Sequence, residues 1–147
     1  MSEEGNTIFT TEEVLQQAQA DFTATWLSTI AYLKEQNLSP VDWSAWLGRR
    51  FAPGWEGFKG QGANEVARIT ALNCVAFGGT LRSSSGDESR AELVIEGWPS
   101  ADLLEFAQIT QTEADVLWAS FEQIIPSLGL QFHWQREGNT VKITISR

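Results

Sequence analysis

The spacing of apolar residues changes along the chain from a helical period to a strand period, and this change restricts the fold more than any other feature. Between residues 10 and 36, apolar side chains recur at steps of three and four, which places them on one stripe of a helix: Leu15, Ala18, Phe22, Trp26, Ile30 and Leu33. Over residues 130–134 and 141–145, apolar and polar residues alternate instead, as they do in strands with one buried face. The chain must therefore build both helices and a sheet.

Local signals mark where further helices begin and end. Thr10 and Thr110 are each followed three residues later by a glutamate, the capping-box pattern that satisfies free N–H groups at a helix start. Ser39 followed by Pro40 marks another start. These signals predict helices over 10–36, from 39 to a stop at Pro53-Gly54, from about 63, after Pro99, and over 111–128 with a kink or shortening at Pro126.

Two hairpins complete the predicted fold. The first has a short strand ending near Arg82, a polar turn over residues 83–89, and a strand over 90–97. The second joins the two alternating segments at the C-terminus through the turn at 136–139. We therefore expect a single α+β domain over residues 10–147, with an antiparallel sheet of four to five strands and helices packed on one face. Residues 1–9 are expected to be a flexible N-terminus.

Charge and composition exclude several classes of function. A formal net charge of −9 over 147 residues opposes binding to nucleic acid or to an anionic membrane surface. The start has no secretory pattern, and no apolar run approaches the roughly 18 residues of a membrane helix, so we expect a cytoplasmic protein. One cysteine and one histidine cannot supply a zinc site, and no phosphate-binding glycine loop is present. The sequence predicts no metal and no cofactor.

Cys74 and His133 are the two side chains with catalytic potential. Cys74 lies in an apolar stretch, where cysteine most often behaves as a small buried hydrophobe. His133 shares its parity on the last hairpin with Gln131 and Gln135, so we expect it to face solvent. The alternative is a hydrolase that uses Cys74 as nucleophile and His133 as base.

Seven tryptophans are the other unusual feature. Trp26, Trp118 and Trp134 fall on or beside apolar stripes and are expected in the core. Residues 43–58 are different, because one narrow helix face cannot bury all of their aromatic side chains together with a double arginine. Two interpretations stay open. Either a helix packs into the core and is covered by the loop at 55–58, or the segment walls an apolar cavity between helices and sheet.

The cavity interpretation predicts a domain that binds or senses a small apolar or aromatic molecule, with or without an anionic group, and without catalysis. Arginine suits a carboxylate or phosphate. The candidate ligand-binding residues are Trp43, Trp46, Arg49, Arg50, Trp55 and Trp98. A third possibility, beside the binding domain and the Cys74 hydrolase, is a protein–protein interaction module without ligand, and we expect a homodimer.

Short motifs over residues 62–147 resemble a known group of domains. They are Val94-Ile-Glu-Gly-Trp-Pro99, the predicted helix that ends at Leu128-Gly-Leu130, and the strand Gly138-Asn-Thr-Val-Lys-Ile143. In these the chain resembles small ligand-binding domains of the vinyl-reductase type and is similar to aminothiazoline carboxylate hydrolase-like proteins. The resemblance implies a cavity between helices and sheet, often in a dimer. Those families often have a Cys-Pro pair where this chain has Trp98-Pro99, so their metal or thiol chemistry does not transfer to these positions.

Overall fold

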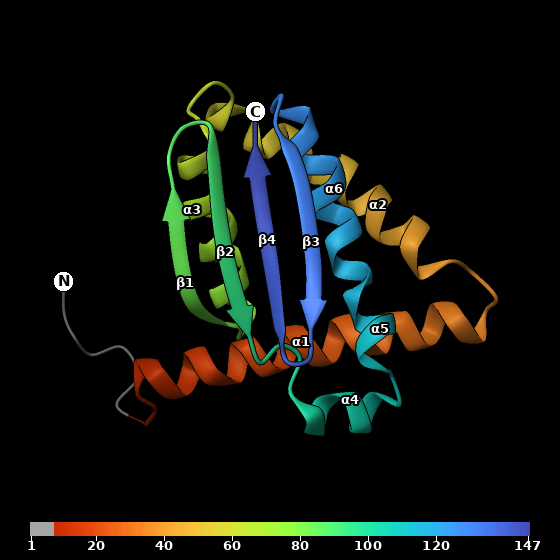
Figure 1. Ribbon diagram of the computed structural model, residues 1–147. Helices are drawn as coiled ribbons and strands as arrows, with labels where there is room; N and C mark the ends of the chain where they lie inside the picture. The colour runs from red at the N-terminus through yellow and green to blue at the C-terminus, as the bar shows by residue number, and fades with distance from the viewer. Residues whose placement is uncertain (1–7) are drawn as a thin grey trace.

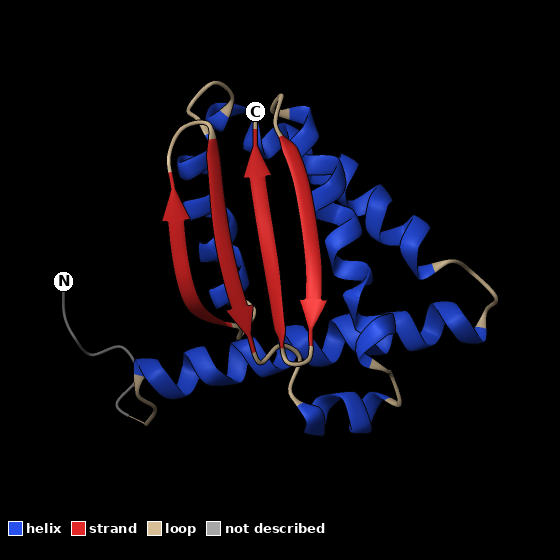
Figure 2. Cartoon of the chain, in the orientation of Figure 1, coloured by secondary structure: helices blue, strands red, loops and turns tan. Residues whose placement is uncertain are grey.

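The computed structural model describes residues 8–147 as a four-stranded antiparallel sheet with helices on one face (Figure 2). The strand order is β1-β2-β4-β3, so the two hairpins meet through the pairing of β2 with β4. The strands are β1 (Thr80–Gly86), β2 (Arg90–Glu96), β3 (Gln131–Glu137) and β4 (Thr140–Ser146). This arrangement confirms the expected α+β class. The expected flexible N-terminus falls largely on residues 1–7, outside the described residues.

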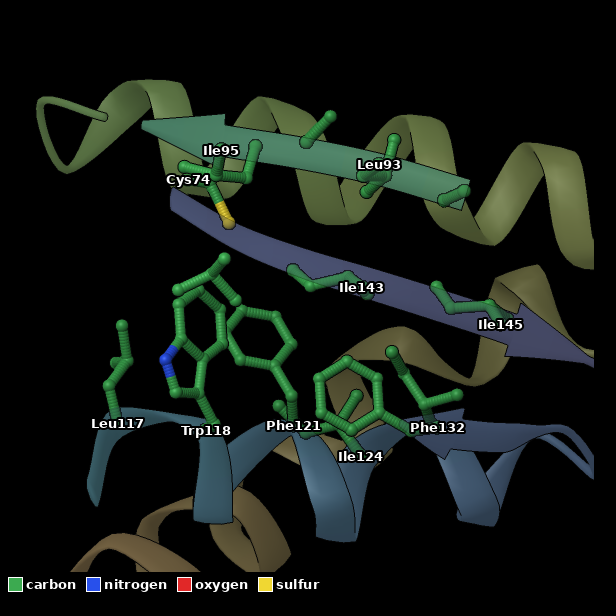
Figure 3. Packing of buried hydrophobic residues seen from close by; sticks show 14 of the residues in the cluster. Cys74, Leu93, Ile95, Leu117, Trp118, Phe121, Ile124, Phe132, Ile143 and Ile145 are labelled. Atoms are coloured by element: carbon green, nitrogen blue, oxygen red, sulfur yellow. The ribbon is translucent and has the colours of Figure 1, made fainter. Parts of the chain in front are cut away.

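Alternation along the strands gives the sheet one buried and one solvent-facing side. Leu93, Ile143 and Ile145 are fully buried on the inner side, whereas Lys142 and His133 are exposed on the outer side. Two helices cover the inner side (Figure 1). They are α3 (Ala63–Ala76), which packs on β1, β2 and β4, and α6 (Trp118–Ser127), which packs on β3. The core lies between these helices and the sheet (Figure 3).

The long helix α1 (Thr11–Glu35) crosses one end of the sheet (Figure 1). Its predicted capping box is present: the Glu13 N–H donates to Thr10 Oγ1 at 3.1 Å, and the Thr10 N–H donates to the Glu13 carboxylate at 2.8 Å. The chain then returns along α2 (Pro40–Phe51), which packs on α6. The short helix α4 (Ala101–Ala107) packs against α1. The predicted helices at 10–36 and after Pro99 are thereby confirmed.

The ends of two predicted helices can be compared with the structure. The second α-helix ends at Phe51, just before Pro53-Gly54 as predicted, but the chain continues as the 3₁₀ segment η1 (Ala52–Phe58), where proline occupies an early position that needs no N–H partner. The predicted helix over 111–128 is divided into α5 (Gln111–Ala114), the 3₁₀ turn η2 (Asp115–Leu117) and α6. Pro126 does not shorten α6, which runs to Ser127.

The first hairpin also differs from its prediction. Strand β1 runs through the triple serine to Gly86, and Ser83, Ser84 and Ser85 pair with β2. The turn is only at residues 87–89, where the Asp87 carboxylate accepts the Ser89 N–H at 2.8 Å. A polar composition misled the prediction because β1 is an edge strand with every side chain exposed, so no apolar alternation marks it.

Candidate functional site

A cavity of about 280 Å³ lies between α1, α2, α3 and α6. No strand residue of the described chain lines it, so it lies among helices and not between helices and sheet as expected. Aromatic rings from five segments form most of its wall: Phe22 and Trp26 of α1, Trp43 and Phe51 of α2, Trp55 of η1, Phe77 after α3, and Phe121 of α6. We call this space the aromatic cavity. Its wall is assembled from residues that are up to a hundred positions apart in the chain.

The rings around the aromatic cavity form two connected rows. In the first row, the Trp26 and Trp43 centroids lie 4.8 Å apart at 40°, and Phe22 stacks on Phe77 with centroids 4.9 Å apart. In the second row, Trp55 meets the edge of Phe121 at 6.1 Å. These distances are those of favourable aromatic pairs, so each ring is held by its neighbours. The second row continues through Trp118 and Phe132 into the core under the sheet (Figure 3). Trp118 also packs on Trp134.

Small residues on α2 orient two of the cavity side chains. A Cβ on Gly48 would lie 2.3 Å from the Ser120 carbonyl oxygen, so α2 and α6 touch backbone to backbone at this point. Ser44, one turn earlier, is fully buried at the same contact, where its hydroxyl donates to the Leu117 carbonyl at 3.5 Å. Because Ser44 and Gly48 face α6, the adjacent Trp43 and Leu47 are turned into the cavity.

The polar groups of the cavity wall are few and mostly satisfied within their own helices. The Thr29 hydroxyl donates to the Thr25 carbonyl at 2.8 Å, and Asn73 Nδ2 donates to the Ile69 carbonyl at 2.9 Å. The Ser120 hydroxyl donates to the Leu117 carbonyl at 2.6 Å. Within residues 8–147, no ionisable side chain lines this cavity. The wall therefore offers apolar contact with little polar and no charged character.

Trp26 is the exception among these polar groups. Its side chain is buried, with 7% of its surface exposed, and its Nε1 has no hydrogen-bond partner among the described residues. The sequence places Trp26 in the core, and it does pack there, but its ring also lines the cavity. The threonines at 25 and 29 beside the apolar stripe are the signal that this part of α1 does not face a purely apolar core.

The structure brings together only two of the six candidate ligand-binding residues. Trp43 and Trp55 line the aromatic cavity. Trp46 lies on the outer side of α2, 49% exposed, with the Arg50 guanidinium 5.7 Å from its ring centroid. Arg49 lines a separate surface depression beside Glu56 and Lys59.

Trp98 is also outside the cavity wall. It is buried behind Phe77, where its Nε1 donates to Thr23 Oγ1 at 2.9 Å. Because Arg49 lines another depression and Arg50 lies over Trp46, neither arginine is placed to bind an anionic group in the aromatic cavity. Sequence reasoning missed Phe22, Phe77 and Phe121, because no local pattern shows that these distant positions share one wall. Phe51 belongs to the aromatic segment 43–58 but is not among the six candidates.

Cys74 and His133 lie on opposite sides of the sheet. Cys74 belongs to α3 and packs among the inner-face residues (Figure 3), and burial raises the pKa of its thiol to about 12. His133 is exposed on β3 and pairs with Thr144 on the outer side. The thiol is thus protonated at neutral pH and separated by the sheet from the histidine. This arrangement disfavours proton transfer between them.

Further features bear on the classes excluded from sequence. In the described part of the chain, no group of three or more His, Cys, Asp or Glu side chains is placed to hold a metal ion. None of the helices in residues 8–147 has the length and apolar character needed to cross a membrane.

No protein-family model matches the chain, and a search of curated proteins finds no match.

Proposed function

We propose that this protein binds a small, largely apolar molecule in the aromatic cavity. The observation that carries the proposal is the unfilled space itself, which adjoins a well-packed core. The cavity is partly open to solvent, since Phe22 and Phe51 of its wall are 39% and 55% exposed, and ligand sites in proteins are typically such concave, mostly apolar spaces. A cavity of about 280 Å³ is roughly twice the ~150 Å³ that accommodates benzene. It suits a molecule of about two fused aromatic rings.

The lining supports binding or sensing rather than catalysis. Aromatic and aliphatic side chains dominate the wall, and the polar side chains among them are hydroxyls and one amide. Such groups orient a ligand but supply neither an activated nucleophile nor a general base. A bound molecule would contact α1, α2 and α6 at once, so its binding would stabilise the arrangement of these helices.

A pair of leucine variants tests the proposal. Leu47→Phe adds volume inside the aromatic cavity, whereas Leu72→Phe makes the same change at an exposed position of α3 outside it. For any bicyclic aromatic compound that binds the unaltered protein, calorimetry should show affinity weakened at least about tenfold by Leu47→Phe, because overlap with the new ring is costly. Leu72→Phe should leave affinity unchanged. Equal affinity in both variants would place binding elsewhere.

A second proposal is that the protein forms a homodimer through the start of α1. Large apolar side chains are exposed there, including Val14 at 49% and Leu15 at 53%. This end of α1 extends past the edge of the sheet (Figure 1). Exposed apolar patches commonly mark interfaces, and the resemblance to vinyl-reductase-type domains implies the same. Light scattering should show a dimer at high concentration that Leu15→Glu converts to a monomer. A monomer at every concentration contradicts this proposal.

A further inference from the structure

The aromatic cavity carries no charge to meet a charged ligand. Its polar wall residues are Thr25, Thr29, Asn73 and Ser120, and no ionisable residue of the described chain is among the lining. A carboxylate or an amine moved from water into such a space loses its hydration and gains no counter-ion. The wall therefore selects against ions. The expectation that a double arginine would bind an anionic ligand finds no support, because neither Arg49 nor Arg50 lines the cavity.

One buried hydrogen-bond donor in the side chains around the cavity has no partner among the described residues. Trp98 Nε1 donates to Thr23, and Trp118 Nε1 donates to Asp115 at 3.2 Å. Trp26 Nε1 has no such partner among residues 8–147, although the ring is as thoroughly buried as theirs. A buried donor without an acceptor is destabilising, and native structures rarely keep one without a reason.

Three other polar groups of the wall are already engaged as donors. The hydroxyl groups of Thr29 and Ser120 and the amide of Asn73 all donate to carbonyl groups of their own helices or of the preceding turn. The hydroxyl of Thr25 and the indoles of Trp43 and Trp55 also line the cavity, but these side chains are exposed or only half-buried. Trp26 Nε1 is the buried donor without a partner in the described structure, so it gains most from an acceptor on a ligand. Because Nε1 is closed to solvent, an acceptor can reach it only if the Trp26 ring, or the Trp43 ring that packs on it, rotates.

We propose that the ligand is a neutral aromatic molecule with one hydrogen-bond acceptor, such as a ketone or lactone carbonyl, and that Trp26 Nε1 donates to that acceptor. The inference rests on the proposed function of the aromatic cavity. It adds that the ligand is uncharged and that Trp26 is the residue that recognises its polar group.

Three planar naphthalenes of nearly equal shape test this chemistry: 2-acetylnaphthalene, 2-isopropenylnaphthalene and 2-naphthoate. They present a ketone, a hydrocarbon and an anion. By calorimetry at pH 7, the ketone should bind about tenfold more tightly than the hydrocarbon, the upper range for one buried hydrogen bond. The naphthoate should bind more weakly than both. In ¹⁵N spectra, the Trp26 indole proton should move downfield with the ketone and not with the hydrocarbon.

Matched tryptophan variants complete the test. Trp26→Phe should reduce the ketone's affinity to that of the hydrocarbon, and Trp46→Phe, outside the cavity, should keep the difference. If none of the three compounds binds, the proposed function fails and this inference with it. If they bind but the ketone has no advantage, or the naphthoate binds most tightly, only the inference fails. Should Trp26→Phe not fold, an unmoved Trp26 indole proton in the unaltered protein on ketone binding overturns the inference.

Discussion

The core under the sheet and the aromatic cavity beside it use the same kinds of residue to different effect. Trp118 is 2% exposed and Trp26 is 7% exposed, and both stack on neighbouring aromatic rings. Under the sheet, the space is filled, and Trp118 Nε1 donates to Asp115. At the cavity, space is left open and Trp26 Nε1 is unpaired in the described structure.

This difference teaches that aromatic richness alone does not identify a binding site. What distinguishes the aromatic cavity is incomplete packing and incomplete hydrogen bonding. Proteins break these rules mainly where function requires it, because the open state costs stability that a ligand can restore. The contrast between the two regions can be tested by substitutions on either side and at their boundary.

Arg136→Ala is expected to have the largest effect, because it breaks the polar cluster of the filled core. Arg136 Nε and Nη2 donate to the Asp115 carboxylate at 2.6 and 2.8 Å, and Asp115 is only 7% exposed. Loss of the guanidinium leaves a buried carboxylate without its counter-ion, which lowers the free energy of unfolding by about 3–5 kcal/mol. Urea denaturation followed by circular dichroism measures it.

Arg90→Ala is the control for this prediction. Arg90 pairs with Glu92 at 3.3 Å on the surface, where solvent screens the interaction, so the unfolding midpoint should hardly move. If both variants shift the midpoint equally, the Asp115–Arg136 pair does not hold the filled core together.

Gly48→Ala is expected to act at the boundary between the two regions. The added Cβ would lie 2.3 Å from the Ser120 carbonyl oxygen, so α2 must move away from α6. Overpacking of this kind costs about 1–3 kcal/mol of stability, despite the better helix propensity of alanine. Gly54→Ala in η1 is the matched control, since nothing lies within 4 Å of its Cβ position. Equal stability of the two variants would show that the helices separate freely.

Cys74 reports how well the filled core excludes water. Burial raises the pKa of its thiol from 9.0 to about 12, so above pH 9 the unfolded chain loses a proton that the folded protein keeps. Stability therefore falls as the pH rises from 9 towards 12, by about 1.4 kcal/mol per pH unit. Denaturation at pH 8 and pH 10 should show a steeper loss for the unaltered protein than for Cys74→Ala. Parallel losses would mean that the thiol is not sealed from water.

The smallest expected effect is the difference between two identical substitutions. Trp98→Phe removes a hydrogen bond to Thr23, whereas Trp26→Phe removes an N–H that has no partner in the described structure. Both lose similar aromatic area, so Trp98→Phe should be less stable by about 1 kcal/mol. Thermal unfolding of the two variants side by side measures this. A greater loss for Trp26→Phe would indicate that its N–H is satisfied in solution.

Elements with strong local signals could be predicted from the sequence. Helix α1 follows from its capping box and its apolar stripe, and the hairpin of β3 and β4 follows from alternation around a short turn. The split between α5 and α6 could not be predicted, because the Asp115 carboxylate there binds Arg136, 21 positions away. The site was predicted only in part for the same reason: Trp43 and Trp55 belong to the aromatic segment, but Phe22, Phe77 and Phe121 reach the cavity from other elements.

The sequence by itself determined the class of fold and the faces of its elements, because hydrophobic periodicity is a local property of the chain. Trp43 and Trp46 were both candidates from the sequence, and only the structure placed Trp43 in the cavity wall and Trp46 on the outer side of α2. Only the tertiary structure decided which faces meet and where they fail to fill space. A cavity is what remains when helices that touch at one point, here α2 and α6 at Gly48 and Ser120, and rings that pack in rows do not close on one another elsewhere. The size and position of such a cavity depend on distances between elements, and no spacing of residues along the chain encodes these distances.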